Sequence, residues 1–377
     1  MSRLVQVLPH YSPPYVGGME MRARDRAERL AADGWVVETL TSSGQAYPHT
    51  VTAPNLIVRY LRSVEVAHTP IIFALPVALA RVPADSVIHL ESALAFSPEV
   101  AAAVCGLRRL PYVVRVALDS EGHSRARDAA LRAYQRLVLK IVYRHAARVI
   151  VLTPDDIDLV TIKYKVDPGR VVVIPNATNF ALASSPRRRS PGPLRLLFVG
   201  RVDLQKNVPL LLRSLRRFID RDGLPVHLDL AGDGEDMPAV RALIAELSLA
   251  EHVSIRGFVT GPELERLYEG ADALVLTSTR ETFGQVLLEA MTKAVPVVAS
   301  NIRCVRTIVG DGTTGLLADL DEDSFAAAFR RLAAEPELYD KLSSGALEAA
   351  RQYSMSATVS AYAATYRAVA ARRPPAS

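Results

Sequence analysis

The 377-residue sequence has few cysteines and no long apolar run. Its two cysteines, Cys105 and Cys304, lie far apart, which argues against a disulfide-stapled fold and favours a reducing compartment. The N-terminus, MSRLVQVLPHYSPP, lacks the apolar core and cleavage site of a signal peptide. The longest apolar stretch, Pro70 to Val82, is broken by Pro76 and is too short to span a bilayer. We therefore expect a cytoplasmic protein, with peripheral contact to the inner membrane face left open.

A strong excess of charge of one sign is also missing. The chain has 45 Lys and Arg residues against 40 Asp and Glu residues, which gives a net charge of +5. This balance indicates mild affinity for anions, and we expect no nucleic acid partner. The spacing of His, Cys, Asp and Glu residues does not match a metal site, so we expect neither a metal nor another cofactor. The sequence carries no signal for an oligomeric state.

Apolar runs typical of buried parallel strands alternate with helical patterns along the chain. This alternation predicts the α/β class, with two Rossmann-like doubly wound domains. A stretch rich in Ser, Pro and Arg, NFALASSPRRRSPGP, has no periodicity and interrupts the alternation. We therefore predict an N-terminal domain over residues 1–180, a linker over 181–193, a second domain over 194–355, and a helix with a tail over 356–377.

The stretch 277–300, TSTRETFGQVLLEAMTKAVPVVAS, carries the first candidate site. A buried strand ends there in a polar turn that contains Glu281, and the helix that follows carries Glu289. Backbone N–H groups at the start of such a helix attract phosphate or hydroxyl oxygens. Two carboxylates suit hydroxyl groups, because an ionised carboxylate only accepts hydrogen bonds. A sugar nucleotide offers such hydroxyls, although a solvated turn with one exposed glutamate also fits this stretch.

Three further loops in the second half follow predicted strands. Their polar and glycine residues are Arg201, Lys206, Gly232, Gly234 and Gly257, and Phe258 follows Gly257. The carboxyl ends of parallel strands meet at one edge of a sheet, so these loops should lie beside Glu281. Two cations close to a helix start could grip a diphosphate. In the first half, Gly17 and Gly18 precede a helix and either let backbone approach a ligand or form an ordinary loop.

A basic helical pattern runs from Arg125 to Arg148, with Leu, Ile and Val between the cations. A solvated helix face and a contact with an anionic membrane surface or an acidic acceptor both fit this pattern. The cations are Arg125, Arg127, Arg132, Arg136, Lys140, Arg144 and Arg148.

Several segments together resemble the large group 1, or GT4-like, family of retaining glycosyltransferases with the GT-B fold. They are VGRVDLQKN, AGDGE, GFV, ETFGQVLLEAM, PVVAS and VGDGTTGLL, in this order and spacing. The resemblance is strong from Leu194 to Asp319 and weaker earlier, where PPYVGGME, VIHLES, LPYVV and VDPGRVVVIPN match. It implies two Rossmann-like domains that face a central cleft, and a C-terminal helix that crosses back to the N-terminal domain.

The resemblance also implies roles for the matched residues. Arg201 and Lys206 would hold the diphosphate of a nucleotide sugar, and Glu289 would bind the ribose hydroxyls. Glu281 would position the transferred sugar, so it joins the two cations and Asp119 in the expected catalytic set. The full donor-binding set is Gly17, Gly18, Arg201, Lys206, Gly232, Gly234, Phe258, Glu281, Thr282, Phe283, Gly284, Gln285, Leu287 and Glu289.

The first half departs from the family pattern where acceptors usually bind. Relatives commonly place a histidine after the LPYVV-type strand, but this chain has Ala117, Leu118 and Asp119 there. A second histidine is frequent where this chain has Glu91. We interpret these changes as the mark of an unusual acceptor. The expected acceptor-binding set is His89, Glu91, Asp119 and His123.

The resemblance implies transfer of a hexosyl or N-acetylhexosaminyl group from a nucleotide diphosphate sugar, with UDP as the expected nucleotide. The acceptor hydroxyl would be glycosylated with retention and without a metal. The acceptor is either an envelope glycan or lipid-linked sugar, or a small natural product such as an aminocyclitol. A sugar-nucleotide epimerase-like enzyme and a non-catalytic GT-B binding subunit are the alternatives. The non-catalytic subunit is disfavoured because a decayed enzyme should also have lost its donor-binding residues, and these are intact: Arg201, Lys206, Glu281 and Glu289.

Overall fold

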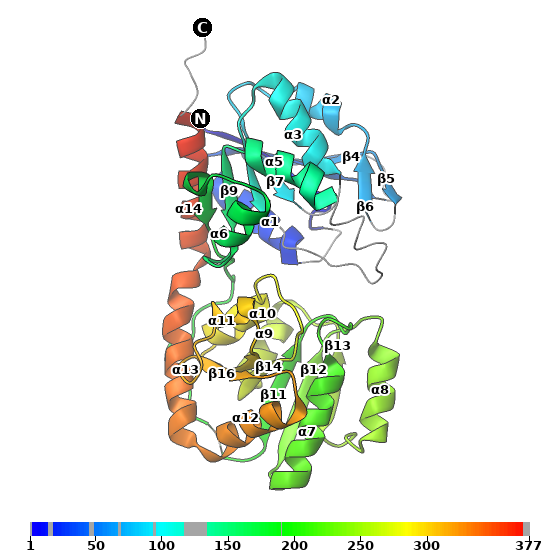
Figure 1. Cartoon of the computed structure of the whole chain (residues 1–377), viewed down its shortest axis with the longest axis vertical. Coiled ribbons are helices and arrows are strands. Elements are labelled where there is room, and N and C mark those ends of the chain that lie inside the picture. The colour runs from blue at the N-terminus through cyan, green and yellow to red at the C-terminus, as the bar shows by residue number, and fades with distance from the viewer. Residues whose placement is uncertain are drawn as a thin grey trace. The chain divides into compact units, whose positions relative to one another are not determined.

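The chain forms two compact units, which Figure 1 shows in a computed structural model. The structure describes residues 2–13, 18–44, 49–66, 69–92, 96–116, 134–189 and 191–371. Unit 1 comprises Met1–Pro175 and Ser356–Ser377, and unit 2 comprises Asn176–Met355. The division after Pro175 lies earlier in the chain than the predicted boundary after residue 180, and the predicted linker 181–193 belongs to unit 2.

Unit 1 is built on an eight-stranded sheet with the order β10-β9-β8-β7-β1-β2-β4-β3. Neighbouring strands pair in parallel, except that β3 and β4 are antiparallel. A separate antiparallel ribbon consists of β5 (Ser63–Val66) and β6 (Thr69–Ile72). The strands of the large sheet are β1 (Arg3–Val7), β2 (Val36–Ser42), β3 (His49–Ala53), β4 (Leu56–Leu61), β7 (Val87–Ser92), β8 (Tyr112–Val116), β9 (Arg148–Val151) and β10 (Val171–Val173).

The helices of unit 1 pack on this sheet. They are α1 (Gly18–Ala32), α2 (Leu75–Ala80), α3 (Ser97–Arg108), α5 (Lys140–His145), α6 (Asp156–Asp158) and α14 (Met355–Ala371). Turns of π-helix (Gln135–Leu139 and Leu159–Lys163) and of 3₁₀-helix (Pro168–Arg170) join them. One buried cluster unites α2, α3 and α5 with the sheet through Leu79, Cys105 and Val142. Helix α1 buries Ala23, Ala27 and the charged Arg26.

The predicted basic helix from Arg125 to Arg148 is described only in part. Arg125, Arg127 and Arg132 lie outside the described residues. In α5, Val142 and Tyr143 are buried, whereas Ile141 and Arg144 are exposed. This part is therefore amphipathic, as the pattern predicts. No helix within the described ranges is long and apolar enough to cross a membrane.

Unit 2 contains a six-stranded, fully parallel sheet with the order β13-β12-β11-β14-β15-β16. The strand order reverses between β11 and β14, which makes this the point where open α/β sheets bind ligands. Every residue of β14 and β15 is buried, which explains their continuous apolar sequences. The strands are β11 (Leu194–Val199), β12 (Val226–Ala231), β13 (Val253–Gly257), β14 (Ala273–Leu276), β15 (Val297–Ser300) and β16 (Gly315–Ala318).

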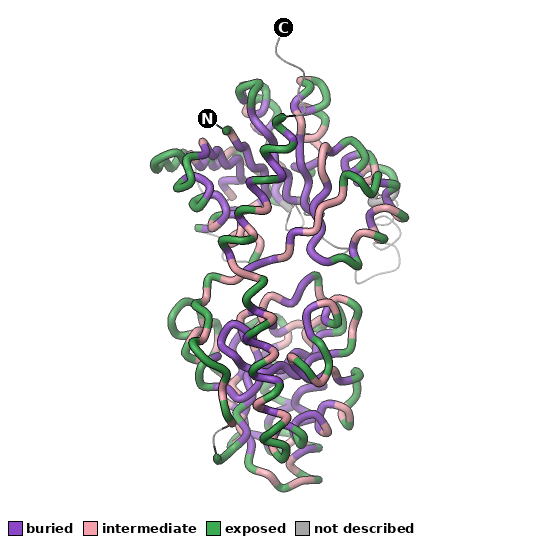
Figure 2. Tube along the Cα trace, turned by 90° about the vertical axis from the view of Figure 1, so that its left-hand side faces the viewer, coloured by how far each residue is buried: buried purple, intermediate pink, exposed green. Residues whose placement is uncertain are grey.

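The helices of unit 2 place their apolar faces on that sheet. In α7, Leu211, Leu215 and Phe218 are buried at helical spacing, and the helix ends at Gly223 in the left-handed conformation. Figure 2 shows the buried parts of the chain inside each unit and the exposed parts on the outer turns. The helices are α7 (Val208–Asp222), α8 (Met237–Glu246), α9 (Gly261–Gly270), α10 (Gln285–Thr292), α11 (Arg303–Arg306), α12 (Glu322–Ala334) and α13 (Pro336–Ala350), with a 3₁₀ turn at Arg351–Tyr353.

Residues 181–193 are hydrogen-bonded to the body of unit 2. The Ala183 amide donates to the Thr292 carbonyl over 2.8 Å, and the Arg187 amide donates to the Ser343 hydroxyl over 2.7 Å. The composition of residues 181–193 is typical of a loop, which is why a linker is predicted here. Composition reflects local polarity and does not reveal these long-range contacts. The described residues of this segment, 181–189 and 191–193, thus form a strap on unit 2.

Candidate functional site

Four loops of unit 2 emerge at the carboxyl edge of the sheet and are joined by backbone hydrogen bonds. The amide of Gly200, after β11, donates to the carbonyl of Ala231 over 3.0 Å. Gly232, after β12, donates to Gly257 over 2.7 Å, and Thr279, after β14, donates to Gln205 over 2.9 Å. The predicted gathering of these loops is therefore present within unit 2.

Gly232 and Gly234 allow the first two loops to touch. Gly232 has a φ of +155°, and a Cβ there would lie 1.8 Å from the Gly200 carbonyl oxygen. A Cβ on Gly234 would lie 2.3 Å from the Val202 carbonyl oxygen. Both distances are impossible for a side chain, so glycine is required here by contact between loops. Donor contact by these two glycines stays a prediction.

Lys206 and Glu281 meet across two of these loops. The Lys206 Nζ atom lies 2.5 Å from Glu281 Oε1, and the side chains are only 14% and 7% exposed. The Ser278 hydroxyl also donates to Glu281 Oε1, over 2.7 Å. The Thr277 hydroxyl donates to the Lys206 carbonyl over 2.9 Å. A cation and a carboxylate are thus held together at the edge where a ligand would bind.

Arg201 belongs to the same loop as Lys206 but is exposed. Its guanidinium lies 2.8 Å from Asp203 Oδ2, with 76% of the side chain exposed. Asp203 also accepts the Lys206 backbone amide through Oδ1, over 3.0 Å. Exposed ion pairs contribute little to stability. Arg201 can therefore exchange Asp203 for an anionic ligand with only a small loss of free energy.

The start of α10 presents backbone more than side chains. Phe283 is buried against the edge of Tyr353, with ring centroids 6.3 Å apart, and Leu287 is fully buried. Gly284 precedes the helix in the left-handed conformation, with a φ of +76°. Gln285 Nε2 donates to the Ala177 carbonyl over 2.9 Å. Of the residues predicted to bind the nucleotide sugar, Phe283, Gly284 and Leu287 can therefore offer it only backbone atoms.

The remaining predicted donor residues of unit 2 lie on α10 and on two loops. Glu289 accepts a hydrogen bond of 2.7 Å from the Tyr268 hydroxyl on α9. Thr282 is exposed, and Phe258 is 68% exposed on the loop after β13. The sequence gives no sign of this contact, because the two residues are 21 positions apart on different helices.

In unit 1, His89 and Glu91 lie inside the protein. They are 0% and 2% exposed on β7. Glu91 accepts from Arg26 over 2.9 Å, from Arg115 over 3.0 Å and from His89 Nε2 over 3.2 Å. The Tyr366 hydroxyl of α14 lies 3.0 Å from His89 Nδ1. These polar atoms are engaged within unit 1, and the predicted contact of His89 and Glu91 with an acceptor stays a prediction.

The charges of this network shift its titration. Burial alone would raise the pKa of Glu91, but Arg115 and Arg26 outweigh it and hold the pKa well below its ordinary value. Burial, followed by the charge of Arg26, lowers the pKa of His89 to about 4. His89 is therefore neutral near pH 7, with its Nε2–H directed at Glu91 and its Nδ1 accepting from Tyr366.

The other predicted residues of unit 1 are at the edge of what the structure describes. Gly18 starts α1, and a Cβ there would lie 3.0 Å from an Arg22 guanidinium nitrogen. Gly17, Asp119 and His123 lie outside the described residues, as does Ala117. Their predicted roles stay predictions.

Two family models match this chain. The model for glycosyl transferases group 1 matches residues 183–349, and the model for a glycosyl transferase 4-like domain matches residues 17–177. The chain belongs to the group 1 glycosyltransferases. The predicted family and transferase class are thereby confirmed.

Similar proteins agree with this membership. This group 1 glycosyltransferase is 29% identical to D-inositol 3-phosphate glycosyltransferase of Nocardiopsis dassonvillei over 99% of this chain and 96% of the relative. It is 31% identical to α-D-kanosaminyltransferase of Streptomyces kanamyceticus over 46% of this chain and 45% of that relative. The solved structure of Anabaena HepE in complex with UDP and glucose has a TM-score of 0.75 and 18% identity, over 98% of this chain and 100% of the other. The predicted α/β GT-B fold is confirmed.

Acidification should destabilise unit 1 of this glycosyltransferase through His89. An unfolded imidazole titrates near 6.5, so between pH 6.5 and about 4 the unfolded chain binds a proton that folded His89 does not. The free energy of unfolding should therefore fall as the pH drops through this window, by about 3 kcal/mol for the full shift. Urea titrations at several pH values, followed by the fluorescence of Trp35, measure this in unit 1, because Trp35 is the single tryptophan.

The variant His89→Gln tests the assignment. It should be less stable than the wild type at pH 7 and should lose most of the pH dependence between 6.5 and 4. The matched variant His227→Gln changes a histidine on β12 of unit 2 and should keep the wild-type dependence. An undiminished slope in His89→Gln would contradict the assignment.

Proposed function

We propose that this enzyme is a retaining glycosyltransferase that moves a hexosyl or N-acetylhexosaminyl group from a UDP-sugar to an acceptor hydroxyl without a metal ion. The observation that carries the proposal is the contact between Lys206 and Glu281 beside the start of α10. The contact brings two groups together at one point of the sheet edge: a cation, which can bind phosphate oxygens, and a carboxylate, which can accept hydrogen bonds from sugar hydroxyls. The choice of UDP draws support from Anabaena HepE, whose structure holds UDP and glucose.

In the proposed reaction the bond between the sugar carbon and the diphosphate oxygen breaks, and its electron pair stays on the diphosphate. Lys206 and the exposed Arg201 would hold the charge that develops there. The acceptor oxygen would bond to the sugar carbon on the same face and pass its proton to the departing phosphate oxygen. Glu281 would hold the transferred sugar through its hydroxyls, and Glu289 would hold the ribose.

A small, soluble cyclitol is the acceptor we favour over a lipid-linked glycan. The Nocardiopsis relative is named for D-inositol 3-phosphate and aligns with nearly the whole chain. The Streptomyces relative is named for transfer of a kanosaminyl group, which suits the alternative of a natural-product acceptor. Turnover of D-inositol 3-phosphate in the absence of detergent supports the choice, and turnover only with lipid-linked acceptors contradicts it.

Two other activities are separable from this one. An epimerase-like enzyme would convert the nucleotide sugar with no acceptor present, which product analysis reveals. A non-catalytic binding subunit would bind the nucleotide without turnover. The intact Lys206–Glu281 pair argues against the second alternative, because a subunit that had lost catalysis should have lost such residues as well.

Nucleotide binding should raise the melting temperature of the wild-type protein. A ligand at about 100 times its Kd adds about 2.7 kcal/mol to the free energy of unfolding by linkage. In a screen of UDP-, GDP-, ADP- and dTDP-sugars we expect the largest rise with a UDP-sugar. A rise with none of the four donors contradicts the proposal.

Removing either proposed phosphate cation should slow transfer. Arg201→Ala and Lys206→Ala each take away a charge at the departing diphosphate, so the rate should fall by roughly 100- to 1,000-fold. Circular dichroism checks that the variants are folded, and wild-type rates in both variants would refute the assigned site.

The proposed reaction needs no metal ion. Turnover measured with excess EDTA should therefore equal turnover measured without it.

Glu281→Gln should separate nucleotide binding from transfer. The neutral amide leaves the charge of Lys206 for the diphosphate, so UDP should bind more tightly, on the order of tenfold. Transfer should fall because the carboxylate no longer holds the sugar hydroxyls. Isothermal titration and rate assays measure the two effects.

Glu335→Gln is the control for Glu281→Gln. Glu335 also carries an ion-paired carboxylate of unit 2, 3.4 Å from Arg331 at the end of α12, and it takes no part in the proposed site. This variant should leave both UDP affinity and transfer unchanged. We propose that Lys206 exchanges Glu281 for the diphosphate when the nucleotide binds. If Glu281→Gln weakened UDP binding as much as Lys206→Ala does, this exchange would be contradicted.

A further inference from the structure

The buried hydroxyl of Tyr268 is directed at Glu289. Tyr268 lies near the end of α9 and is 0% exposed, and its Oη atom donates to Glu289 Oε2 over 2.7 Å. Burial, reinforced by the charge of Glu289, raises the pKa of Tyr268 well above its ordinary value. The phenol therefore stays protonated and keeps donating at every pH where the enzyme works.

Tyr268 is itself fixed by the strap over residues 181–193 and by Phe180 just before it. The ring of Phe180 meets the ring of Tyr268 edge-on, with centroids 5.6 Å apart. Arg187 Nη1 donates to the carbonyls of Tyr268, over 3.3 Å, and of Ala271, over 2.8 Å. The tyrosine is thus held at its ring and at its backbone, which leaves its hydroxyl little freedom to turn away from Glu289.

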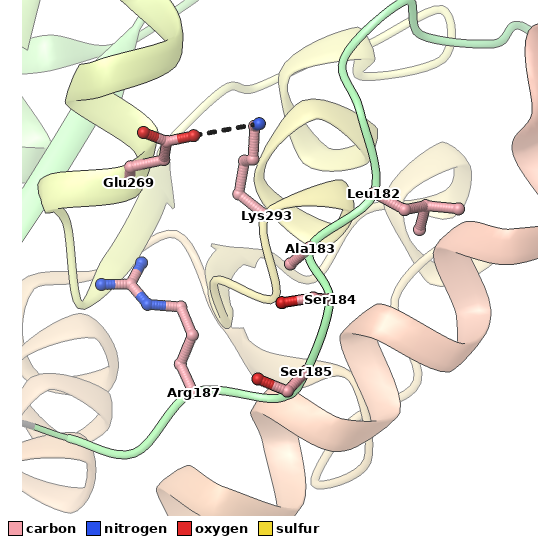
Figure 3. Close-up of a pocket in the computed structure, with 7 residues that line it drawn as sticks. All are labelled: Leu182, Ala183, Ser184, Ser185, Arg187, Glu269 and Lys293. Carbon is pink, nitrogen blue, oxygen red and sulfur yellow. Dashed lines mark ion pairs between the residues drawn. The ribbon is translucent and has the colours of Figure 1, made fainter.

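Figure 3 shows the strap beside α9. Residues 182–185 and Arg187 line a cavity of about 320 Å³ together with Glu269 and Lys293, which form an ion pair of 3.1 Å. Lys293 Nζ also lies 5.8 Å from the centroid of the Phe180 ring. Phe180 is therefore anchored by a cation as well as by Tyr268.

We infer that Tyr268 is a positioning residue that orients Glu289 toward the ribose hydroxyls of the bound nucleotide. The inference rests on the proposed function, which gives Glu289 its contact with the ribose. A glutamate has three side-chain torsions, and binding must otherwise meet the cost of ordering them. A buried hydroxyl that fixes one carboxylate oxygen removes that cost before the nucleotide arrives.

Tyr268→Phe removes the hydroxyl and keeps the ring. Binding of UDP and of 2′,3′-dideoxy-UDP, measured by calorimetry, separates a ribose effect from a general loss of structure. We expect UDP to bind about tenfold more weakly to the variant, the effect of one hydrogen bond to a charged group. The dideoxy nucleotide, which lacks both hydroxyls, should bind equally to the variant and to the wild type.

Tyr339→Phe is the matched control. Tyr339 is also a fully buried tyrosine of unit 2, but its hydroxyl has no hydrogen-bond partner among the described residues. This variant should leave the affinities for both nucleotides unchanged. A double variant gives a second measure: with Glu289→Ala already present, Tyr268→Phe should weaken UDP binding no further.

Three results with the variants would overturn the inference. They are wild-type UDP affinity in Tyr268→Phe, equal weakening for both nucleotides, and an undiminished effect of Tyr268→Phe in the Glu289→Ala background. If the wild-type protein binds UDP and its dideoxy form equally well, Glu289 does not contact the ribose hydroxyls, and this inference is then wrong as well. The donor screen and the Lys206 variants test the proposed transferase separately from these outcomes.

Discussion

The ion pair between Lys206 and Glu281 is the interaction around which the candidate site of unit 2 is assembled. The two residues are 75 positions apart, and they meet because all six strands run in parallel and release their loops at one edge. Backbone hydrogen bonds fix the loops before any side chain is considered. A part-buried lysine and a part-buried glutamate each need a partner, and here each supplies the other. The proposed site for an anion is thereby kept assembled, with the charge of Lys206 balanced by that of Glu281.

Periodicity accounts for most of what the sequence predicts correctly in unit 2. Continuous apolar runs mark β14 and β15, and the polar residues that follow strands gather as parallel topology requires. The contact of Tyr268 with Glu289 lies beyond such reasoning, since it depends on how α9 and α10 pack. The strap at 181–193 could not be predicted from periodicity for the same reason. Its Ser, Pro and Arg residues are typical of a linker, and only their partners in the folded unit show otherwise.

Unit 1 shows a different limit of sequence reasoning. In β7 the residues alternate, so that Ile88 and Leu90 join the apolar cluster while His89 and Glu91 share the opposite face. The predicted contact of these two residues with an acceptor comes from the family resemblance, because relatives usually bind acceptors at this part of the first half. Here that face is covered by Arg26 of α1 and by α14, and one buried carboxylate binds two guanidinium groups. The pattern reveals the polar face but not what lies over it.

Unit 1 is made from two pieces of chain, with the whole of unit 2 inserted between them. The returning piece is bonded to the first: Thr358 donates to the Pro175 carbonyl over 3.4 Å, and Tyr366 of α14 contacts both His89 and Trp35. On the ribosome, every residue of unit 2 is synthesised before α14 exists. Unit 2 can therefore begin to fold before α14 is made, whereas unit 1 stays incomplete, with Trp35 and His89 not yet in contact with Tyr366, until α14 has left the exit tunnel.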